Sequence, residues 1–280
     1  MKQKIKFTKM HGLGNDFVIV NNLNKNFLFT PKIISQLSHR NTGIGFDQLL
    51  VVERSKYSHL DFFYKIFNAN GKEVYQCGNG ARCFAHFVYL KKLTTKKNIY
   101  VYTKQSTLHI NNIDKEEIIV NMGKPIFEPY KIPFLVPEYN KEYSITIEDK
   151  NIVCSVLSLG NPHCIVNTKN IFKTSVTFLG GLIERHFLFP EGVNVSFMQI
   201  KTTNEISLRV YERGVGETKA CGSAACAAVI VGILQKKITM GRDIIVHLPG
   251  GVLKIFWENK KSCVYMKGPS THVYDGIINI

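Results

Sequence analysis

The sequence lacks the signatures of several protein classes. None of its seven cysteines belongs to a Cys-x-x-Cys pair, which disfavours a zinc site or a thioredoxin-like site. No Rossmann glycine fingerprint and no P-loop is present, so no motif indicates a cofactor. The longest apolar run of the second half, Ala224–Leu234, is interrupted by Gly232 and is shorter than the roughly 20 residues that span a bilayer.

The N-terminal segment lacks the apolar core and cleavage site of a secretory signal peptide, because Met1–Lys9 alternates lysine with apolar residues. We therefore expect a cytoplasmic location, no membrane partner and reduced cysteines. Hydrophobic residues make up 45% of the 280, which is typical of a globular protein. This length accommodates one large domain or two smaller ones.

The charge balance is basic, with 36 lysines and arginines against 21 acidic residues and a formal net charge of +15. Such a surface can bind nucleic acid. The lysines are nevertheless spread along the chain in short clusters such as Lys91–Lys97, without an RNP-like, zinc-finger or basic-helix pattern. We therefore expect no nucleic-acid partner. A non-enzymatic basic binding protein stays open as an alternative, and it predicts salt-dependent affinity for nucleic acid.

Most of the chain has the composition of short strands. The candidate strands are Lys4–Met10, Phe17–Asn21, Leu49–Val52, Leu60–Phe67, Asn98–Thr103, Ile118–Met122, Ile152–Ser158, Cys164–Val166, Val193–Ile200, Ile206–Tyr211, Ile244–His247, Val252–Trp257 and Cys263–Lys267. Thr30 and Pro31 are typical of an N-cap and a first helical position, and they predict a helix over Pro31–Ser38. Two stronger helices are predicted directly after Cys77 and Cys221.

The two halves of the sequence contain the same motifs in the same order. Each of the two cysteines precedes a glycine and an apolar helix, and each has a glutamate four residues and an aromatic residue ten residues before it. The matched segments are Gly14-Asn15 with Gly160-Asn161, Gly45-Phe46-Asp47 with Gly192-Val193-Asn194, and Cys77-Gly78 with Cys221-Gly222. Their offsets of 146 (161 − 15), 147 (192 − 45) and 144 (221 − 77) residues are nearly constant.

This repetition predicts two copies of one unit. We expect each copy to be an αβ unit whose strands wrap around its apolar helix. The two helices are apolar on nearly every face, which predicts that both are buried. The Pro-rich stretch Lys124–Pro137 is the expected linker.

The position of the two cysteines indicates acid–base chemistry. A helix N-terminus has unsatisfied N–H groups and a positive dipole end, which lower the pKa of a nearby thiol from about 8.5 towards neutrality and can bind a carboxylate. If the repeats face each other, two thiols flank one bound amino acid. One thiolate removes the Cα proton and the other thiol returns a proton to the opposite face. We therefore expect a cofactor-independent epimerase with Cys77 and Cys221 as catalytic residues.

The other cysteines are expected to be small core residues. They are Cys83, Cys154, Cys164, Cys226 and Cys263.

Four runs of the sequence resemble diaminopimelate epimerases. They are His11–Phe17, Asn68–Cys83, Gly160–His163 and Tyr211–Ser223. The resemblance covers essentially the whole chain and implies interconversion of LL- and meso-2,6-diaminoheptanedioate, a step of lysine and peptidoglycan precursor biosynthesis. It also implies a homodimer and an α/β fold of the α+β type. This fold has two pseudo-symmetric domains, each a mixed, largely antiparallel curled sheet around a central helix, with the active site in the cleft between the domains. Because the last segment of the family returns to the first domain, the expected domains are 1–121 plus 267–280, and 122–266.

The resemblance also implies roles for individual residues. Cys77 and Cys221 match the catalytic thiols, while His163 and Glu212 match positions that modulate the pKa of the thiols. No metal ligand is implied. The residues matching those that hold the reacting carboxylate at the helix starts are Gly78, Asn79, Gly222 and Ser223. The remaining substrate-binding polar residues are Asn15, Gln48, Asn68, Asn161, Asn194, Glu212 and Arg213.

The departures from the family pattern are small. Asn70 stands where aspartate is usual, Lys72 where serine is usual, and Ser223 where threonine is common. A proline or hydroxyproline racemase or a phenazine-type isomerase on the same duplicated fold stays open as an alternative. The polar residues Asn68, Glu212 and Arg213 favour a substrate with two charged ends, because the distal carboxylate and ammonium need donors and an acceptor.

Overall fold

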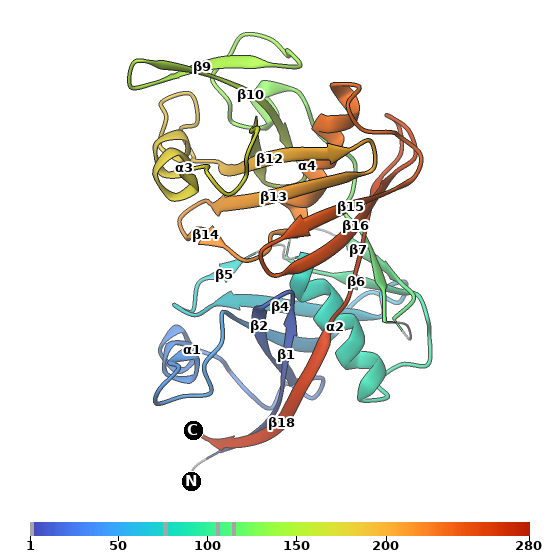
Figure 1. Cartoon of the computed structure of the whole chain (residues 1–280). Helices are drawn as coiled ribbons and strands as arrows, with labels where there is room; N and C mark the ends of the chain where they lie inside the picture. The colour runs from blue at the N-terminus through green and yellow to red at the C-terminus, as the bar shows by residue number, and fades with distance from the viewer. Residues whose placement is uncertain (1–2, 75–77, 105–106, 114–115) are drawn as a thin grey trace. The chain divides into compact units, whose positions relative to one another are not determined.

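The structure is a computed structural model that describes residues 3–74, 78–104, 107–113 and 116–280. The chain divides into two compact units (Figure 1). Unit 1 comprises Met1–Asn121 and Gly268–Ile280, and unit 2 comprises Met122–Lys267. The two units repeat one arrangement of strands and helices, which confirms the predicted fold class.

Unit 1 is a mixed sheet with helices α1 (Pro31–Ser38) and α2 (Gly78–Leu90). Its strands are β1 (Lys4–Gly12), β2 (Asn15–Asn21), β3 (Gln48–Arg54), β4 (Phe62–Asn68), β5 (Glu73–Val74), β6 (Ile99–Tyr102), β7 (Thr107–Asn111), β8 (Ile118–Asn121) and β18 (Thr271–Asn279). The β2–β3 and β4–β6 pairs are parallel, whereas β1–β2, β3–β4, β4–β5, β6–β7, β7–β8 and β1–β18 are antiparallel.

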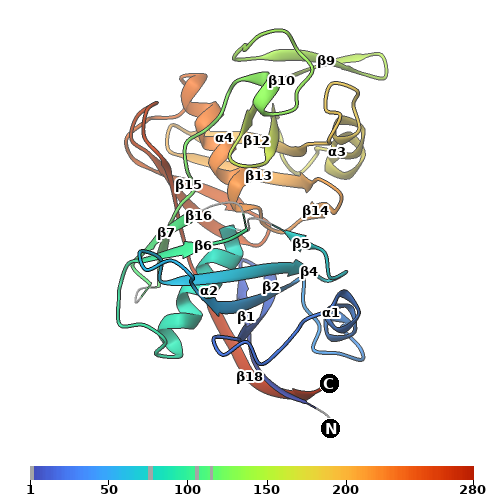
Figure 2. The same ribbon diagram turned by 180° about the vertical axis from the view of Figure 1, so that it is seen from behind.

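Unit 2 repeats this pattern with helices α3 (Val176–Glu184) and α4 (Gly222–Leu234) and a short 3-10 helix η1 (Pro129–Lys131). Its strands are β9 (Tyr143–Ile147), β10 (Lys150–Ser158), β11 (Pro162–Asn167), β12 (Asn194–Thr202), β13 (Glu205–Glu212), β14 (Gly216–Thr218), β15 (Asp243–Leu248), β16 (Gly251–Trp257) and β17 (Val264–Gly268), whose last residue belongs to unit 1. The parallel pairs β11–β12 and β13–β15 occupy the places of β2–β3 and β4–β6. Figure 2 shows α3 beside β12 and β13.

The strand registers define which residues of the two units are equivalent. Phe17 pairs with Gln48 in the β2–β3 ladder, and His163 pairs with Asn194 in the β11–β12 ladder. Asn194 is therefore the counterpart of Gln48, and the sequence-based match of Asn194 with Asp47 is wrong by one residue. The shift arises because unit 1 has one more residue than unit 2 between the positive-φ glycine of the preceding turn and the start of the strand.

Local sequence signals explain α1. The side chain of Thr30 accepts a hydrogen bond from the N–H of Ile33 at 3.3 Å, and Pro31 occupies the first turn, where it removes no intrahelical bond. Ile34 and Leu37, three residues apart, are the buried face of the helix. The helix predicted over Pro31–Ser38 is therefore confirmed.

The helices that follow Cys77 and Cys221 are both buried. In α4 the run from Ala224 to Ile233 is buried on all sides, and it packs against β10, β11, β12, β13 and β16. The small side chains of this helix allow the strands to approach it closely. In unit 1, α2 contacts β1, β2, β3, β7 and β8 in the same way (Figure 1).

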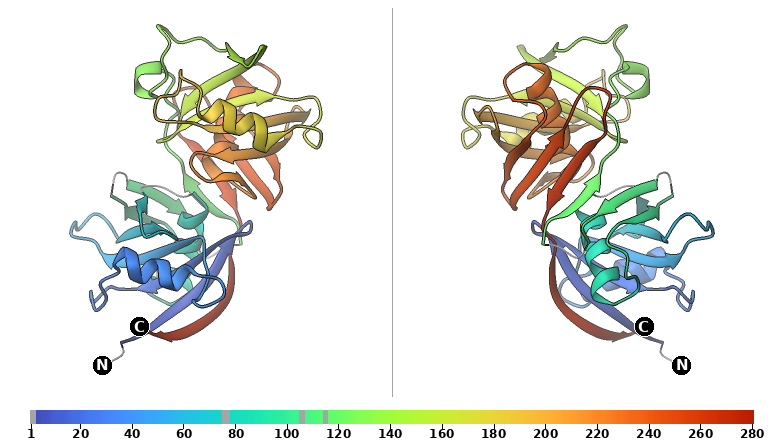
Figure 3. Two further views of the ribbon diagram at one scale, coloured as in Figure 1. Left: turned by 90° about the vertical axis from the view of Figure 1, so that its left-hand side faces the viewer. Right: turned by 90° about the vertical axis from the view of Figure 1, so that its right-hand side faces the viewer.

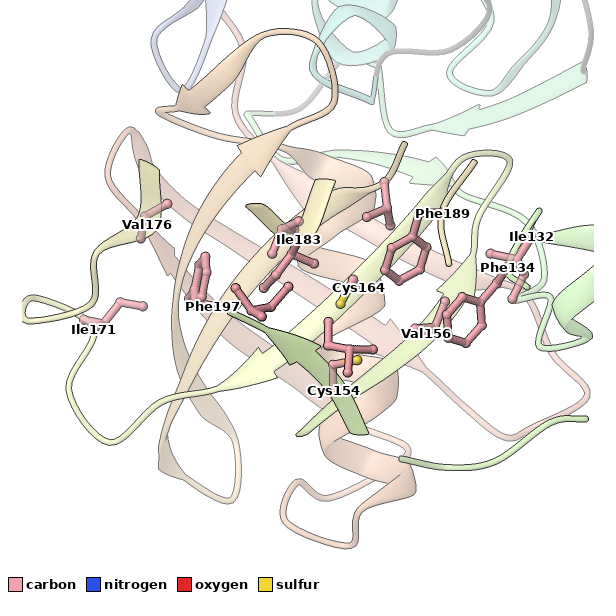
Figure 4. Packing of buried hydrophobic residues seen from close by; sticks show 14 residues of the cluster. Ile132, Phe134, Cys154, Val156, Cys164, Ile171, Val176, Ile183, Phe189 and Phe197 are labelled. Atoms are coloured by element: carbon pink, nitrogen blue, oxygen red, sulfur yellow. The ribbon is translucent and has the colours of Figure 1, made fainter. Parts of the chain in front are cut away.

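The Pro-rich stretch expected to be a linker belongs to unit 2. Ile132 and Phe134 are 1% and 3% exposed, and they pack into the core cluster that also contains Cys154 and Cys164 (Figure 4). The stretch is further held by paired backbone hydrogen bonds between Ile126 and Ser158. The prolines thus shape a packed segment with buried apolar residues between them, and the linker interpretation is wrong.

Unit 1 is completed by residues from both ends of the chain. Strand β18 pairs with β1 from the Lys4–Asn279 pair to the His11–Thr271 pair, and both panels of Figure 3 show the two strands running side by side. Gln3 and Ile280 exchange backbone hydrogen bonds at 2.9 and 3.0 Å. Among the described helices, none combines the length and apolar character needed to span a bilayer.

Candidate active site

Three predicted substrate-binding residues lie at one end of the sheet in unit 1. Asn15 begins β2, Gln48 begins the parallel neighbour β3, and Asn68 ends the antiparallel neighbour β4. Gln48 Nε2 donates to Asn68 Oδ1 at 2.8 Å. Gln48 Oε1 and Asn15 Oδ1 are buried and have no hydrogen-bond partner among the described residues. Two acceptors are therefore left at this end of the sheet for a ligand's donors.

The N-terminus of α2 is fixed from within unit 1. The helix begins at Gly78, and Asn79 in its first turn is 3% exposed. The fully buried Arg82 donates from Nη2 to Asn79 Oδ1 at 2.8 Å and from Nε to the carbonyl of Pro269 at 3.1 Å. Cys77, the first predicted catalytic residue, lies outside the described residues.

The corresponding strand ends of unit 2 hold the second polar set. Asn194, at the start of β12, donates to the carbonyl of Pro162 at 3.0 Å and accepts from the backbone N–H of Arg213 at 3.1 Å. Thr218 donates to Glu212 Oε1 at 2.6 Å, which holds this carboxylate at the end of β13. The strand pairing thus brings Asn194, Glu212 and Arg213 to one end of the sheet in unit 2.

Cys221 is at the position that the sequence predicts for a catalytic thiol. It is the N-cap residue of α4, directly before Gly222, and it is 7% exposed. Its Sγ lies 3.6 Å from Ser223 Oγ, a distance at which a hydroxyl can donate a hydrogen bond to a thiolate. The thiol therefore meets both the positive end of a buried helix and a side-chain donor.

A hydrogen-bonded chain connects Cys221 with the buried His163. Asn161 Nδ2 donates to Ser223 Oγ at 3.4 Å, and Asn161 Oδ1 lies 3.0 Å from His163 Nε2. The contact with Oδ1 requires that the histidine carries its proton on Nε2. His163 therefore reaches the thiol through Asn161 and Ser223.

His163 is uncharged in this environment. Its complete burial, together with the positive charge of Arg213, lowers its pKa to about 3. A neutral ring suits the single contact to Asn161, because protonated imidazole would add a second donor at Nδ1, which is buried without a partner among the described residues. The histidine is consequently a structural donor near neutral pH and carries no charge towards the thiol.

The structure also identifies polar residues to which the sequence analysis assigned no role. Arg82 fixes Asn79, and Thr218 fixes Glu212. A charged cluster adjoins Asn15 and consists of Lys9, Asp16, Arg40 and Asp47. Thr218 meets Glu212 through the antiparallel pairing of β13 and β14, and the charged cluster also forms through folding, so no sequence motif detects them. Arg82 is the exception, because an arginine in an otherwise apolar helix is itself a signal of a buried polar contact. Among the described residues, no three His, Cys, Asp or Glu side chains are grouped as metal ligands would be.

Solved structures of epimerases and isomerases share this fold. A hydroxyproline epimerase from Agrobacterium vitis with bound trans-4-OH-L-proline has a TM-score of 0.71 at 12% identity, covering 100% of this chain and 94% of that one. A phenazine biosynthesis protein of the PhzF family from Bacillus anthracis has a TM-score of 0.67 at 17% identity, covering 99% and 100%. A methylitaconate-delta-isomerase has a TM-score of 0.66 at 11% identity, covering 100% and 96%.

The duplicated fold, together with a family match over most of the chain, assigns this protein to the epimerase- and isomerase-type enzymes. A family model described as diaminopimelate epimerase matches residues 7–128 and 155–273, which is most of the chain. The chain belongs to the diaminopimelate epimerase family.

Proposed function

We propose that this enzyme interconverts LL- and meso-2,6-diaminoheptanedioate by a two-cysteine mechanism without a cofactor. The observation that carries the proposal is the equivalence of α2 and α4 in the two units. Each helix is buried, each begins with a glycine, and in the sequence a cysteine precedes that glycine in both. Inversion at a single carbon requires two acid–base residues, one on each face of that carbon, and a duplicated cysteine supplies them.

In the proposed reaction, the thiolate of one cysteine removes the Cα proton and the thiol of the other delivers a proton to the opposite face. The pair of electrons left by the proton is delocalised into the carboxylate, whose oxygens accept hydrogen bonds from the first-turn amides of the helices. On the Cys221 side, Ser223 supplies a donor that favours the thiolate. Reversal of the two roles catalyses the reverse direction.

The substrate is proposed from the polar groups at the strand ends. The free acceptors Asn15 Oδ1 and Gln48 Oε1 suit an ammonium group, and Arg213 and Glu212 suit a second carboxylate and a second ammonium. A substrate with only one charged end, such as proline, would leave part of this set unpaired, which disfavours its binding. The proposed specificity is therefore for an amino acid that carries charges at both ends.

The proposal is tested by solvent exchange at Cα. Reduced enzyme incubated with LL-diaminoheptanedioate in heavy water should incorporate deuterium at Cα and form the meso isomer, whereas hydroxyproline should exchange at a far lower rate. The Cys77→Ala and Cys221→Ala variants should lose inversion. Cys263→Ala is the matched control, because Cys263 is a partly exposed thiol between β16 and β17 that precedes no helix, and it should retain full activity.

Two results would contradict the proposal in different ways. Inversion that survives in either helix-start variant would remove the two-base mechanism. A folded, reduced wild-type enzyme that exchanges hydroxyproline but not diaminoheptanedioate would remove the substrate and leave the class of enzyme intact.

A further inference from the structure

A charged cluster lies beside Asn15 in unit 1. Arg40 binds both carboxylate oxygens of Asp16 at 2.9 and 3.0 Å and reaches Asp47 Oδ1 at 2.7 Å. Lys9 Nζ lies 2.6 Å from Asp16 Oδ2. The backbone N–H of each aspartate donates to the carboxylate of the other, at 3.0 and 3.1 Å. These contacts tie the start of β2 to the segment that leads into β3.

The charge distribution within the cluster is uneven. Burial alone would raise the pKa of Asp16, but hydrogen bonds from Arg40 and Lys9 outweigh it and hold that pKa well below its ordinary value. Burial and the neighbouring Asp16 carboxylate instead raise the pKa of Asp47. Hydrogen bonds from Arg40 and from the backbone N–H of Asp16 thus hold the Asp47 carboxyl in place, although burial and the Asp16 carboxylate disfavour its negative charge.

The fold does not require charged residues at these positions. By the strand registers, the unit 2 counterparts of Lys9, Asp16 and Asp47 are the apolar residues Val156, Pro162 and Val193. Unit 2 builds the same strand pairs with these side chains buried. Partly buried ion pairs are in general weak evidence for stability. The charges of unit 1 therefore point to a role other than folding.

The cluster meets the candidate site at Asn15. Asp47 Oδ2 lies 3.4 Å from Asn15 Nδ2. Because Asp47 Oδ2 also accepts a hydrogen bond from the backbone N–H of Asp16, it is an acceptor here, and this contact assigns the NH2 group of the amide to the side of Asp47. The opposite atom, Asn15 Oδ1, is the buried acceptor that has no partner among the described residues. Asp47 thereby selects which of the two amide atoms is offered to a ligand.

We infer that Asp47, held by Arg40 and Asp16, is a positioning residue that keeps the Asn15 amide turned so that its carbonyl oxygen accepts a hydrogen bond from an ammonium group of the substrate. The inference rests on the proposed function, which supplies an amino-acid substrate. A reversed amide would present N–H donors to the ammonium and lose the interaction. Since this contact exists before and during the reaction, its loss weakens binding more than turnover.

The test compares Asp47→Asn and Asp47→Val with the matched control Glu53→Gln. The valine variant copies the residue that unit 2 carries at this place, so the strand pairs are retained. Glu53 is a buried acid of β3, paired with Lys65 at 2.9 Å, and it lies at the end of β3 opposite to the end that adjoins Asn15. The first measurement is the side-chain amide resonance of Asn15 in ¹⁵N-labelled enzyme without substrate, assigned with Asn15→Ala.

Both Asp47 variants should shift the Asn15 resonance, and Glu53→Gln should not. With diaminoheptanedioate as substrate, KM should rise on the order of 10-fold or more in both Asp47 variants, while kcat changes by less than about 3-fold. An unmoved Asn15 resonance, or a loss confined to kcat, would overturn the inference. Absence of Cα exchange by the wild-type enzyme would instead refute the proposed function, and the resonance would still decide whether Asp47 orients Asn15.

Discussion

Acidification should destabilise unit 2 through His163, and a single substitution should remove this effect. The pKa of His163 is lowered by burial to about 3, whereas in the unfolded chain it returns to the ordinary value of 6.5. The unfolded state therefore takes up a proton first as the pH falls. The stability that depends on neutral His163 is fully present above about pH 6.5 and is lost as the pH drops towards 3.

The size of the effect follows from these two values. A pH of 5 lies about 1.5 pH units below the pKa of His163 in the unfolded state, so His163 is protonated in the unfolded state and neutral in the folded state. Each unit is worth about 1.4 kcal/mol, so the free energy of unfolding should fall by about 2 kcal/mol between pH 7 and pH 5. This difference hardly depends on the folded pKa as long as that value lies below about 4. Solvent does not screen this effect, because the ring of His163 is fully buried.

The measurement is denaturant unfolding followed by the fluorescence of Trp257. This residue is the single tryptophan of the sequence, and it is buried in unit 2, so its emission reports on the unit that contains His163. His163→Gln removes the titrating group, and His163→Phe copies the equivalent Phe17 of unit 1. Between pH 7 and pH 5, the free energy of unfolding should fall by about 2 kcal/mol less in both variants than in the wild type. Equal losses in wild type and variants would refute the reasoning.

Two further predictions concern unit 2. A Cβ added at Gly180 would lie 2.6 Å from the side chain of Tyr211, so Gly180→Ala should cost about 1–3 kcal/mol of stability, whereas Gly181→Ala, with its nearest contact at 3.4 Å, should be close to neutral in the same unfolding assay. Equal losses of stability in the two variants would contradict the close packing of Gly180 on Tyr211. Iodoacetamide should alkylate Cys221 at least about 10-fold faster than the core residue Cys226, as followed by peptide mass spectrometry, and equal rates would argue against an activated thiol at the helix start.

The parts of the fold that could be predicted from the sequence are those specified by local signals. The N-cap at Thr30 marks the start of α1, and the cysteine–glycine pairs mark the starts of α2 and α4. The duplication was visible because its motifs recur at nearly constant offsets. These features depend on residues close together in the chain, where turn and capping preferences act directly.

The missed elements depend on distant contacts. Helix α3 contains Gly180 and Gly181, which weaken helix propensity, but Gly180 is required where the helix packs on Tyr211. Strand β18 is largely exposed and carries a glycine, and its pairing with β1 spans almost the full sequence. The charged cluster escaped detection for the same reason, because Lys9, Asp16 and Asp47 come together through the pairing of β1, β2 and β3.

The pairing of β1 with β18 has a consequence for synthesis on the ribosome. Strand β1 must wait for the nine-residue strand β18 before its edge is covered, whereas unit 2 has all its strands available once β17 has been made. Unit 2 is built from one continuous stretch of chain and can therefore fold without waiting for β18, although its sequence comes second. Unit 1 can close only after β18 has been made, and until then β1 presents an open edge to which chaperones or neighbouring nascent chains can bind.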